Sequence, residues 1–302
     1  MFRLFARNPA ATALCAALAA YAASLVVLAR VPGATLGEPL FLLGVLGIGF
    51  PLLARLLTRR PRSVHAPLAP PRRRIGAMLV YLVAFSIAVL GWGFSAIDAQ
   101  WPDGPQQAIA RLIVKLTTMA ALPALLFLQD NRQRPRFGTP RLLVVLSVMA
   151  VAFVAFQAVF GRGLKTLAAL SPSTDTLLWA VPACLFWQIV ETGLCEELLF
   201  RRVLQQRLAD AGGSMFAAIL WASLLFGLAH APGLYLRGAS VLEGVAQPTL
   251  SWAVAYSIAI VAPTGLVFGT LWARTRSLWL VVALHGIVDL IPQLSPFIQS
   301  WR

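Results

Sequence analysis

Long stretches of uncharged, apolar residues are the feature that most constrains the fold of this chain. Residues 9–29 and 75–97 contain no charged side chain, and each stretch exceeds the ~18 residues that indicate a membrane-spanning helix. Hydrophobic residues make up 59% of the sequence and charged residues 12%, whereas soluble domains are about half apolar and about a quarter charged. The sequence therefore predicts an integral membrane protein.

The apolar stretches predict about nine spans. They lie near residues 9–29, 39–57, 75–97, 108–128, 142–160, 177–199, 215–232, 250–272 and 278–294. The last is expected to be short, and a re-entrant or half-length segment would reduce the number to eight. Sustained period-two alternation, which is typical of membrane β-barrels, is missing from the sequence. The predicted fold class is all-α, a polytopic transmembrane helical bundle of about 8–9 spans.

The distribution of charge predicts the orientation of these spans. The formal net charge is +14, but the arginines lie in short loops between apolar stretches, which argues against a nucleic-acid partner. Two loops are rich in arginine, and the first of them contains no acidic residue: Arg55, Arg59, Arg60, Arg62, Arg72, Arg73 and Arg74 lie in the first, and Arg132, Arg134, Arg136 and Arg141 in the second. The positive-inside rule places both in the cytoplasm. Intervening loops with Glu38, Asp98 and Asp103 are predicted to face outside.

Composition also indicates partners and location. The expected partners are membrane lipids and a membrane-associated protein or peptide. The alanine- and arginine-rich composition suggests the inner membrane of a bacterium. Ionisable residues within apolar stretches concentrate after residue 140, so we expect an accessory region of about four spans, residues 1–140, and a second region, residues 141–302, that carries the site.

Three glutamates fall within a single apolar stretch near residues 179–200. A charged group at the centre of a bilayer costs about 2.5–3.5 kcal/mol on insertion scales, so such residues are functional or paired by default. Glu197 and Arg201 are four residues apart and share a helix face, whereas Glu196 points elsewhere. We expect Glu197 to pair with Arg201 and Glu196 to stay available. For Glu191, polar packing and support of the site are equally compatible with the sequence.

Two histidines lie in later spans and are predicted to meet Glu196. A turn at residues 211–214 places Glu196 and His230 at similar depth on two antiparallel helices. His285 and Asp289 share a helix face one turn apart. Phe226 lies one turn from His230 and is expected to pack beside it.

One carboxylate and two imidazoles suit hydrolysis. A desolvated glutamate can act as general base on water, and an imidazole can orient that water or stabilise an oxyanion. Glu196, His230 and His285 are also suitable zinc ligands. Residue spacing does not separate these alternatives.

These residues resemble three motifs of the CPBP family of intramembrane proteases, which includes the type II CAAX prenyl endopeptidases. The motifs are Glu196-Glu197-Leu198-Leu199-Phe200-Arg201 for EExxxR, Phe226-Gly227-Leu228-Ala229-His230 for FxxxH, and His285-Gly286-Ile287-Val288-Asp289 for HxxxN/D. Their order within predicted spans makes the resemblance specific, and it covers roughly residues 140–295.

The resemblance implies a membrane-embedded, glutamic-type endopeptidase that needs no cofactor, with zinc as the less favoured alternative. It implies that Glu196 activates water, that His230 assists it, and that His285 and Asp289 form the oxyanion site. Asn is common at the position of Asp289, and an ionised aspartate cannot donate a hydrogen bond. Two other functions stay open: a proton-coupled transporter that uses the Glu/His cluster as a relay, and a catalytically silent immunity or scaffold protein.

Overall fold

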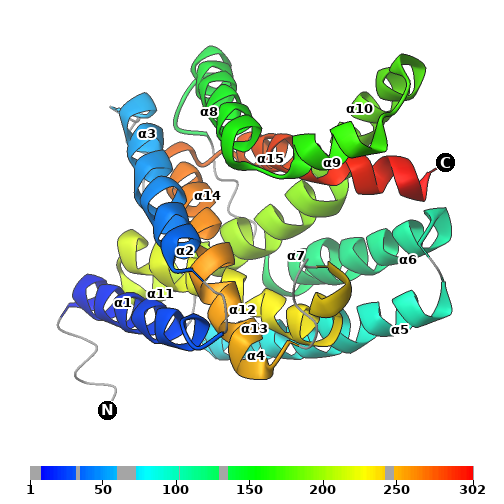
Figure 1. Cartoon of the computed structure of the whole chain (residues 1–302). Coiled ribbons are helices and arrows are strands. Elements are labelled where there is room, and N and C mark those ends of the chain that lie inside the picture. The colour runs from blue at the N-terminus through cyan, green and yellow to red at the C-terminus, as the bar shows by residue number, and fades with distance from the viewer. Residues whose placement is uncertain are drawn as a thin grey trace.

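The computed structural model describes residues 8–31, 35–59, 73–101, 103–128, 135–241 and 248–301. Within these ranges every regular element is helical and there is no β-strand. Several of the long helices contain π-helical segments, labelled η, and continue through them (Figure 1). The predicted all-α fold class is therefore confirmed.

Nine helices in the described ranges are long and apolar enough to cross a membrane. The first four are α1 (Pro9–Leu28); α2 (Gly37–Leu42), η1 (Leu43–Gly49) and α3 (Phe50–Leu57); α4 (Arg73–Phe85), η2 (Ser86–Gly93) and α5 (Phe94–Gln100); and α6 (Pro105–Lys115), η3 (Leu116–Ala121) and α7 (Leu122–Phe127). The other five are α8 (Thr139–Phe160); α10 (Thr174–Gln188), η4 (Ile189–Leu194), η5 (Glu197–Gln205) and α11 (Gln206–Gly212); α12 (Met215–Val241); α13 (Leu250–Tyr256), η6 (Ser257–Val261) and α14 (Ala262–Thr275); and α15 (Leu278–Ser300).

Two details of the predicted spans are wrong, and the helix of the sixth span is longer than its apolar part. The ninth span is 23 residues long and not short, because the helix continues past Pro292 and Pro296; neighbouring helices and local adjustments can satisfy the backbone groups that proline frees. The apolar part of the sixth span was placed at residues 177–199, and the helix continues to Gly212, as the turn predicted at residues 211–214 requires. Glu38 and Asp98 lie in α2 and α5 at the ends of spans, not in loops.

The sixth span continues because its basic second half is held inside the bundle. Arg201 is fully buried and Arg207 is 4% exposed. Arg207 donates a hydrogen bond to the carbonyl oxygen of Phe127 in α7. Gly213, with φ of 65°, then ends α11 in the left-handed conformation that glycine favours. The predicted turn at residues 211–214 is therefore present.

Five of the described helices start with a side-chain cap that the sequence supplies. The side-chain oxygens of Asn8, Ser173, Ser214, Thr249 and Ser277 accept hydrogen bonds from backbone N–H groups in the first turns of α1, α10, α12, α13 and α15. Such caps satisfy donors that a helix leaves unpaired at its N-terminus. They set where five of the spans begin or, for α12, where the helix resumes after the turn.

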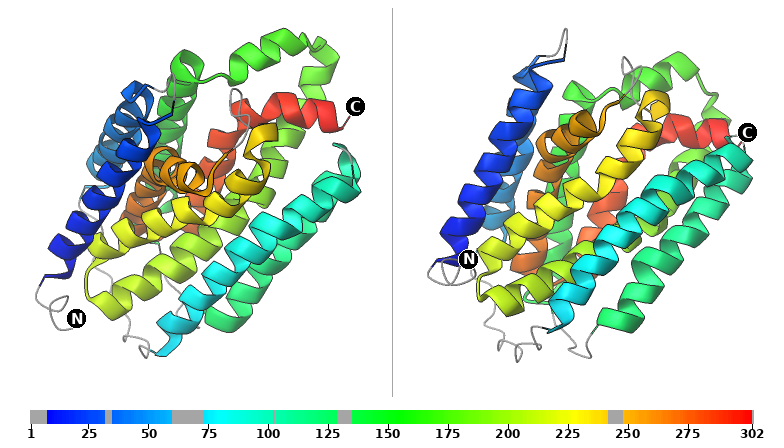
Figure 2. Two further views of the ribbon diagram at one scale, coloured as in Figure 1. Left: turned by 60° about the horizontal axis from the view of Figure 1, so that its bottom comes forward. Right: turned by 90° about the horizontal axis from the view of Figure 1, so that it is seen from below.

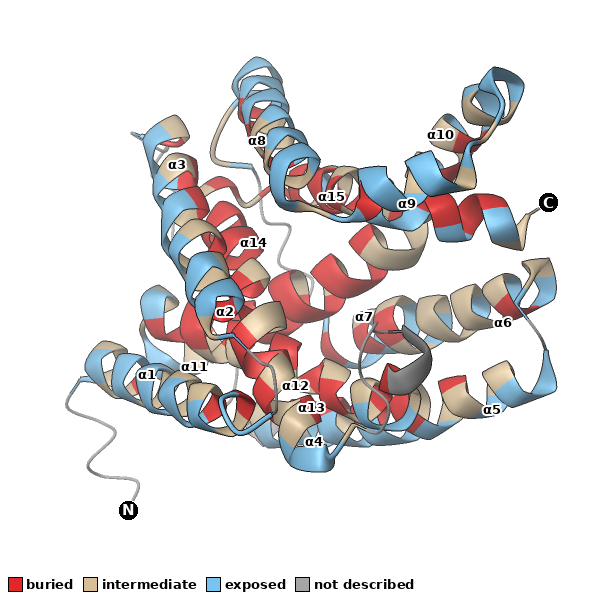
Figure 3. Ribbon diagram, in the orientation of Figure 1, coloured by how far each residue is buried: buried red, intermediate tan, exposed pale blue. Residues whose placement is uncertain are grey.

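The core lies where α12, α14 and α15 pack together. In the most apolar 18-residue windows of the spans that contain these helices, 56%, 67% and 44% of the residues are buried, and the second half of the sixth span, residues 196–207, is also largely buried. Figure 3 shows the same concentration of buried residues in α14, α12 and α15. These three helices and the second half of the sixth span form the centre of the bundle, and the remaining spans cover them.

The N-terminal spans lie on both sides of this core. In the two views of Figure 2, α1 to α3 (blue) and α4 to α7 (cyan) flank the central helices on opposite sides. Phe50 of α3 packs in one apolar cluster with Phe268 of α14, and Met78 of α4 packs in another with Phe226 of α12. Residues before 140 therefore share apolar cores with the later spans, and the proposed domain boundary stays a prediction.

A short additional helix, α9 (Gly163–Leu170), lies between the fifth and sixth spans. It packs on α15 through Gly163, where a Cβ atom would lie 2.6 Å from the carbonyl oxygen of Ile291.

Five arginines that predict the orientation of the spans lie outside the described residues: Arg60, Arg62, Arg72, Arg132 and Arg134. The orientation of the bundle in the membrane thus rests on the sequence.

Candidate active site

The two adjacent glutamates lie where the sixth span departs from regular α-helix. Glu196 stands between the π-helical segments η4 and η5, and Glu197 begins η5. π-Helical turns are rare and occur frequently at functional sites, because they displace side chains from their α-helical positions. The four-residue spacing of Glu197 and Arg201 predicts an unbroken α-helix here, and the π-helical segments differ from that expectation.

Glu197 is the centre of a buried ion-pair cluster. Its Oε2 atom lies 3.1 Å from Nε of Arg201, and its Oε1 atom lies 2.8 Å from Nδ1 of His285. Neither Glu197 nor Arg201 is exposed at all. The guanidinium carbon of Arg201 also lies 4.9 Å from the centre of the Phe226 ring. The predicted pairing of Glu197 with Arg201 is present, and the bond to His285 is an additional finding.

His285 stands between carboxylates on both sides of its ring. Because an ionised Glu197 can only accept, Nδ1 of His285 donates the hydrogen bond between them. The opposite nitrogen, Nε2, lies 3.8 Å from Oε2 of Glu196 and 3.7 Å from Oδ2 of Asp289. Both distances exceed that of a direct hydrogen bond. The ring is also stacked on Phe268, with centroids 4.5 Å apart, so its plane is fixed by packing as well as by Glu197.

His230 is oriented by its own helix. Its Nδ1 atom lies 2.8 Å from the carbonyl oxygen of Phe226, and since a carbonyl only accepts, Nδ1 carries the proton. In the neutral ring, Nε2 is then left as an acceptor. The Phe226 ring lies edge-on to His230 at 5.0 Å, so Phe226 packs beside His230 as predicted.

A cavity of about 440 Å³ brings these side chains together. Three of the four predicted catalytic residues line it: Glu196, His230 and Asp289. The fourth, His285, is only 4% exposed and reaches Glu196 and Asp289 through Nε2. The four residues therefore form one group, and three of them face the cavity. Their roles in a reaction remain predictions.

The cavity wall includes residues from the N-terminal spans, which the sequence analysis did not include in the site. These are Leu90, Phe94, Arg111, Lys115 and Met119. Lys115 forms an ion pair with Glu191, and Oγ1 of Thr192 donates to Oε2 of Glu191 at 3.0 Å. Lys115 lies within a predicted apolar span, and an intramembrane cation calls for a partner. The presence of Lys115 in one apolar span and of Glu191 in another is therefore a sequence signal from which this ion pair could have been predicted.

A second ion pair lies on the same side of the cavity. Nε of Arg111 donates to Oδ1 of Asp98 at 3.0 Å, and Nη1 of Arg237 lies 3.8 Å from Oδ2 of Asp98. Arg237 belongs to α12, so this contact joins the third and fourth spans to the helix that carries His230. Asp98 had been assigned to an outer loop, which is why the sequence analysis missed the contact.

Two glycines let α15 approach the sixth span. A Cβ atom on Gly286 would lie 2.8 Å from the backbone nitrogen of Ile189, and one on Gly193 would collide with the carbonyl oxygen of Val282. Such approaches of backbone to backbone are possible only without a side chain. Gly286 follows His285 directly, so this contact sets the distance between His285 and the two glutamates.

A zinc site would need three ligands at one point. Among the residues that the structure describes, no three side chains of the types His, Cys, Asp and Glu are grouped in this way. The Nδ1 atoms of His230 and His285 already contact the carbonyl of Phe226 and the carboxylate of Glu197. These contacts leave Nε2 of each histidine free to act as a ligand, as in many zinc-bound histidines, so the choice between metal-free and zinc chemistry stays a prediction, and we derive no step through a metal.

Comparison with known proteins identifies the segment that holds these residues. Residues 176–291 match the model of a family described as "Type II CAAX prenyl endopeptidase Rce1-like". The match lies within the predicted extent, roughly residues 140–295, and includes every residue of the three motifs. No match is found among curated proteins or among solved structures.

Proposed function

We propose that this integral membrane protein, whose residues 176–291 belong to the type II CAAX prenyl endopeptidase Rce1-like family, hydrolyses a peptide bond with Glu196 as the base. The substrate is a membrane-associated protein or peptide. The observation that carries the proposal is the common cavity of Glu196, His230 and Asp289 inside the bundle. Residues 141–302 would act as the catalytic domain, with the earlier spans completing the cavity wall.

In the first step, the carboxylate of Glu196 accepts a proton from water. The water oxygen forms a bond to the carbonyl carbon of the substrate, and the carbonyl oxygen becomes an oxyanion. Nε2 of His230 accepts a hydrogen bond from the same water and orients it. General base catalysis of this kind contributes about 10²–10⁴-fold to the rate.

His285 would stabilise the charge that develops in this step. Its Nδ1 proton is held by Glu197, so a second proton on Nε2 gives an imidazolium that donates toward the centre of the site. Stabilisation of an oxyanion by one oriented donor is worth about 10²–10³-fold. Asp289, an acceptor when ionised, would favour the imidazolium form from 3.7 Å.

The second step breaks the C–N bond. The proton that Glu196 took from water passes to the departing amide nitrogen, which leaves as an amine. The other product carries a carboxylic acid with one oxygen from the water. Glu196 returns to its ionised form, so one water molecule is consumed and no other reactant is required.

The experiment compares membrane proteins in cells that lack this chain and in cells that produce either the wild type or Glu196→Gln. Mass spectrometry of new protein termini identifies peptides that only the wild type generates. The matched control is Asp103→Asn in a loop outside the site, which should restore the same termini. Termini restored equally by a stably produced Glu196→Gln variant would contradict the proposal.

A further inference from the structure

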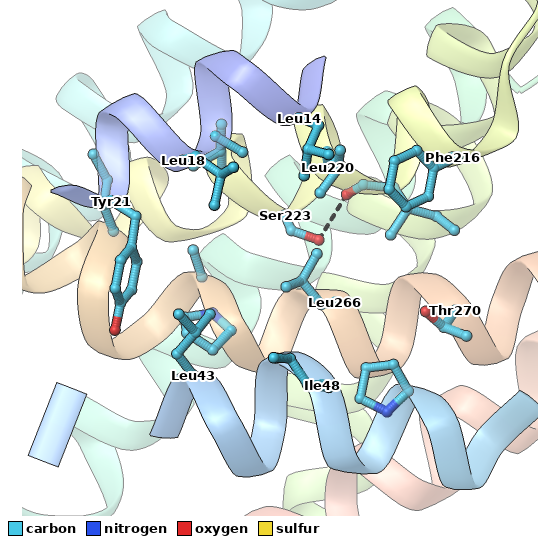
Figure 4. A pocket seen from close by; sticks show the side chains of 18 of the residues that line it. Leu14, Leu18, Tyr21, Leu43, Ile48, Phe216, Leu220, Ser223, Leu266 and Thr270 are labelled. Carbon is cyan, nitrogen blue, oxygen red and sulfur yellow. Dashed lines mark hydrogen bonds between the residues drawn. The ribbon is translucent and has the colours of Figure 1, made fainter. Parts of the chain in front are cut away.

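A second cavity, of about 340 Å³, lies away from the candidate active site. It is bordered by α1 on one side and by η1 and α3 on the opposite side, with α12 and α14 between them (Figure 4). In Figure 4, Leu14 and Leu18 of α1 face Leu43 and Ile48 of η1, with Leu266 of α14 between them. Apart from Arg55, no charged residue lines it.

Two of the polar groups of the wall, the hydroxyls of Ser223 and Tyr21, are hydrogen-bonded within the protein. Oγ of Ser223 donates to the carbonyl oxygen of Ile219 at 2.7 Å (Figure 4). The hydroxyl of Tyr21 donates to the carbonyl oxygen of Pro39 at 2.6 Å. A cavity lined in this way does not hold ordered water, which needs several polar partners. Its occupant must therefore be apolar along most of its length.

The length and orientation of the cavity correspond to one leaflet of a bilayer. From Leu43 to Arg55 the second span rises ~18 Å, which is somewhat more than half of the ~30 Å hydrocarbon core. Arg55 begins the arginine-rich loop that the sequence assigns to the cytoplasm. Thr270, near the end of α14, and Phe216, at the start of α12, line the same end.

Charge at this end is strongly positive. Arg55 and Arg59 are both exposed, and the sequence from Arg55 to Arg74 contains seven arginines and no acidic residue. Basic sites between transmembrane helices at the cytoplasmic face bind anionic lipid headgroups. A neutral lipid would fill the cavity equally well but would gain nothing from Arg55.

We propose that this cavity binds one anionic phospholipid of the cytoplasmic leaflet. One acyl chain lies between α1, η1, α12 and α14, and the phosphate is held at Arg55. The lipid would fasten the first two spans to α12 and α14. These two helices also carry His230 and Phe268, which stacks on His285, so the bound lipid would support the walls of the polar site from outside.

The test measures phospholipid retained by the purified full chain after extensive washing in detergent, by native mass spectrometry. The chain is first equilibrated in vesicles of phosphatidylglycerol and phosphatidylcholine in equal amounts. We expect about one phospholipid per chain, with phosphatidylglycerol preferred. Retention of none, or equal retention of both lipids, would overturn the proposal.

Two substitutions fill the cavity from different walls: Ala17→Phe on α1 and Ile48→Trp on η1. Each should abolish retention of the lipid, whereas Ala19→Phe, on an exposed position of α1, should leave it unchanged. Because the two substitutions lie on different helices, the test still works if one of the two variants does not fold. If a folded Ala17→Phe or Ile48→Trp variant retained as much lipid as Ala19→Phe, the acyl chain of the lipid would have to lie outside this cavity.

The charge is tested separately. Arg55→Gln should lower the preference for phosphatidylglycerol about fivefold, the effect expected from one basic residue near an anionic surface. Arg30→Gln, an exposed arginine at the other end of α1, is the matched control and should have no effect. An unchanged preference in Arg55→Gln would refute the assignment of the phosphate. None of these readouts depends on proteolysis, so they stand apart from the proposed function.

Discussion

Successive stretches of α12 border two cavities of opposite character. Residues 216–224 face the apolar cavity beside α1, and residues 230–238 face the polar cavity beside the glutamates. In the apolar cavity two uncharged hydroxyls donate to backbone carbonyl oxygens, that of Ser223 within its own helix and that of Tyr21 to Pro39 in the second span. In the polar cavity the charges are paired across different spans.

This difference shows which contacts determine the polar site. A buried charge is costly unless a partner compensates it, so each ionic group needs a partner at a defined place. The apolar wall has no comparable requirement and tolerates changes of similar volume. Substitutions in the polar region should therefore have larger effects than substitutions in the apolar region.

The largest effect on stability is expected for Arg201→Met. It removes the buried partner of Glu197 and leaves that carboxylate with His285 alone, and breaking a buried ion pair costs about 3–5 kcal/mol. Denaturation of the purified protein in detergent measures the loss. Arg202→Met, at the neighbouring and less buried position, should cost much less. If the Arg201→Met variant were as stable as the wild type, the buried ion-pair cluster around Glu197 would not stabilise the fold.

A second prediction concerns the close approach beside His285. Gly286→Ala forces α15 away from Ile189, and overpacking of this kind costs about 1–3 kcal/mol. We expect a lower melting temperature and strongly reduced cleavage, because His285 moves away from Glu197. Gly44→Ala, in the second span and with open space around its Cα, is the control. Equal cleavage activity of Gly286→Ala and Gly44→Ala would show that the close approach at Gly286 does not position His285.

The sequence predicts the spans and the ion pair within one helix, but it does not predict the contacts between distant helices. The nine spans follow from the length of the apolar stretches, and the Glu197–Arg201 pair follows from four-residue spacing in one helix. The bond between Glu197 and His285 joins residues 88 positions apart. No local periodicity reports such a contact; it depends on how α15 packs against the sixth span.

The ion pairs of the N-terminal spans also join residues that are far apart in the sequence. Lys115 and Asp98 were visible as charged residues at or near spans, but their partners, Glu191 and Arg237, lie far along the chain. The π-helical segments around Glu196 were equally hidden, because they arise from packing and carry no clear residue signature. Sequence patterns thus identified the ionic residues but not all of their partners.

A third prediction tests the contribution of the N-terminal spans. Lys115→Met leaves Glu191 without its cation, and an unsatisfied buried group costs about 1–3 kcal/mol. The double variant Lys115→Met with Glu191→Leu removes both charges and should recover much of that stability. Thermal melting of the single and double variants checks this. A double variant less stable than Lys115→Met would indicate that Glu191 has another essential partner.

The smallest effect is expected in the apolar region. Arg55→Gln should change lipid preference while the free energy of unfolding in detergent stays within about 0.5 kcal/mol of that of the wild type, as is usual for surface substitutions. Cleavage in mixed vesicles should fall by much less than in Gly286→Ala. A loss of cleavage as large as in Gly286→Ala would show that the two cavities are not distinct in function.

The role of Glu196 in metal-free hydrolysis is tested most directly with a substrate identified in cells. Purified wild type and Glu196→Gln, both treated with chelator and analysed for zinc, are incubated with that substrate in vesicles. The account predicts cleavage by wild type with far less than one zinc per chain, and a rate lower by about 10² or more in a folded Glu196→Gln variant. Equal rates for the two proteins, or cleavage by the wild type that requires stoichiometric zinc, would contradict it.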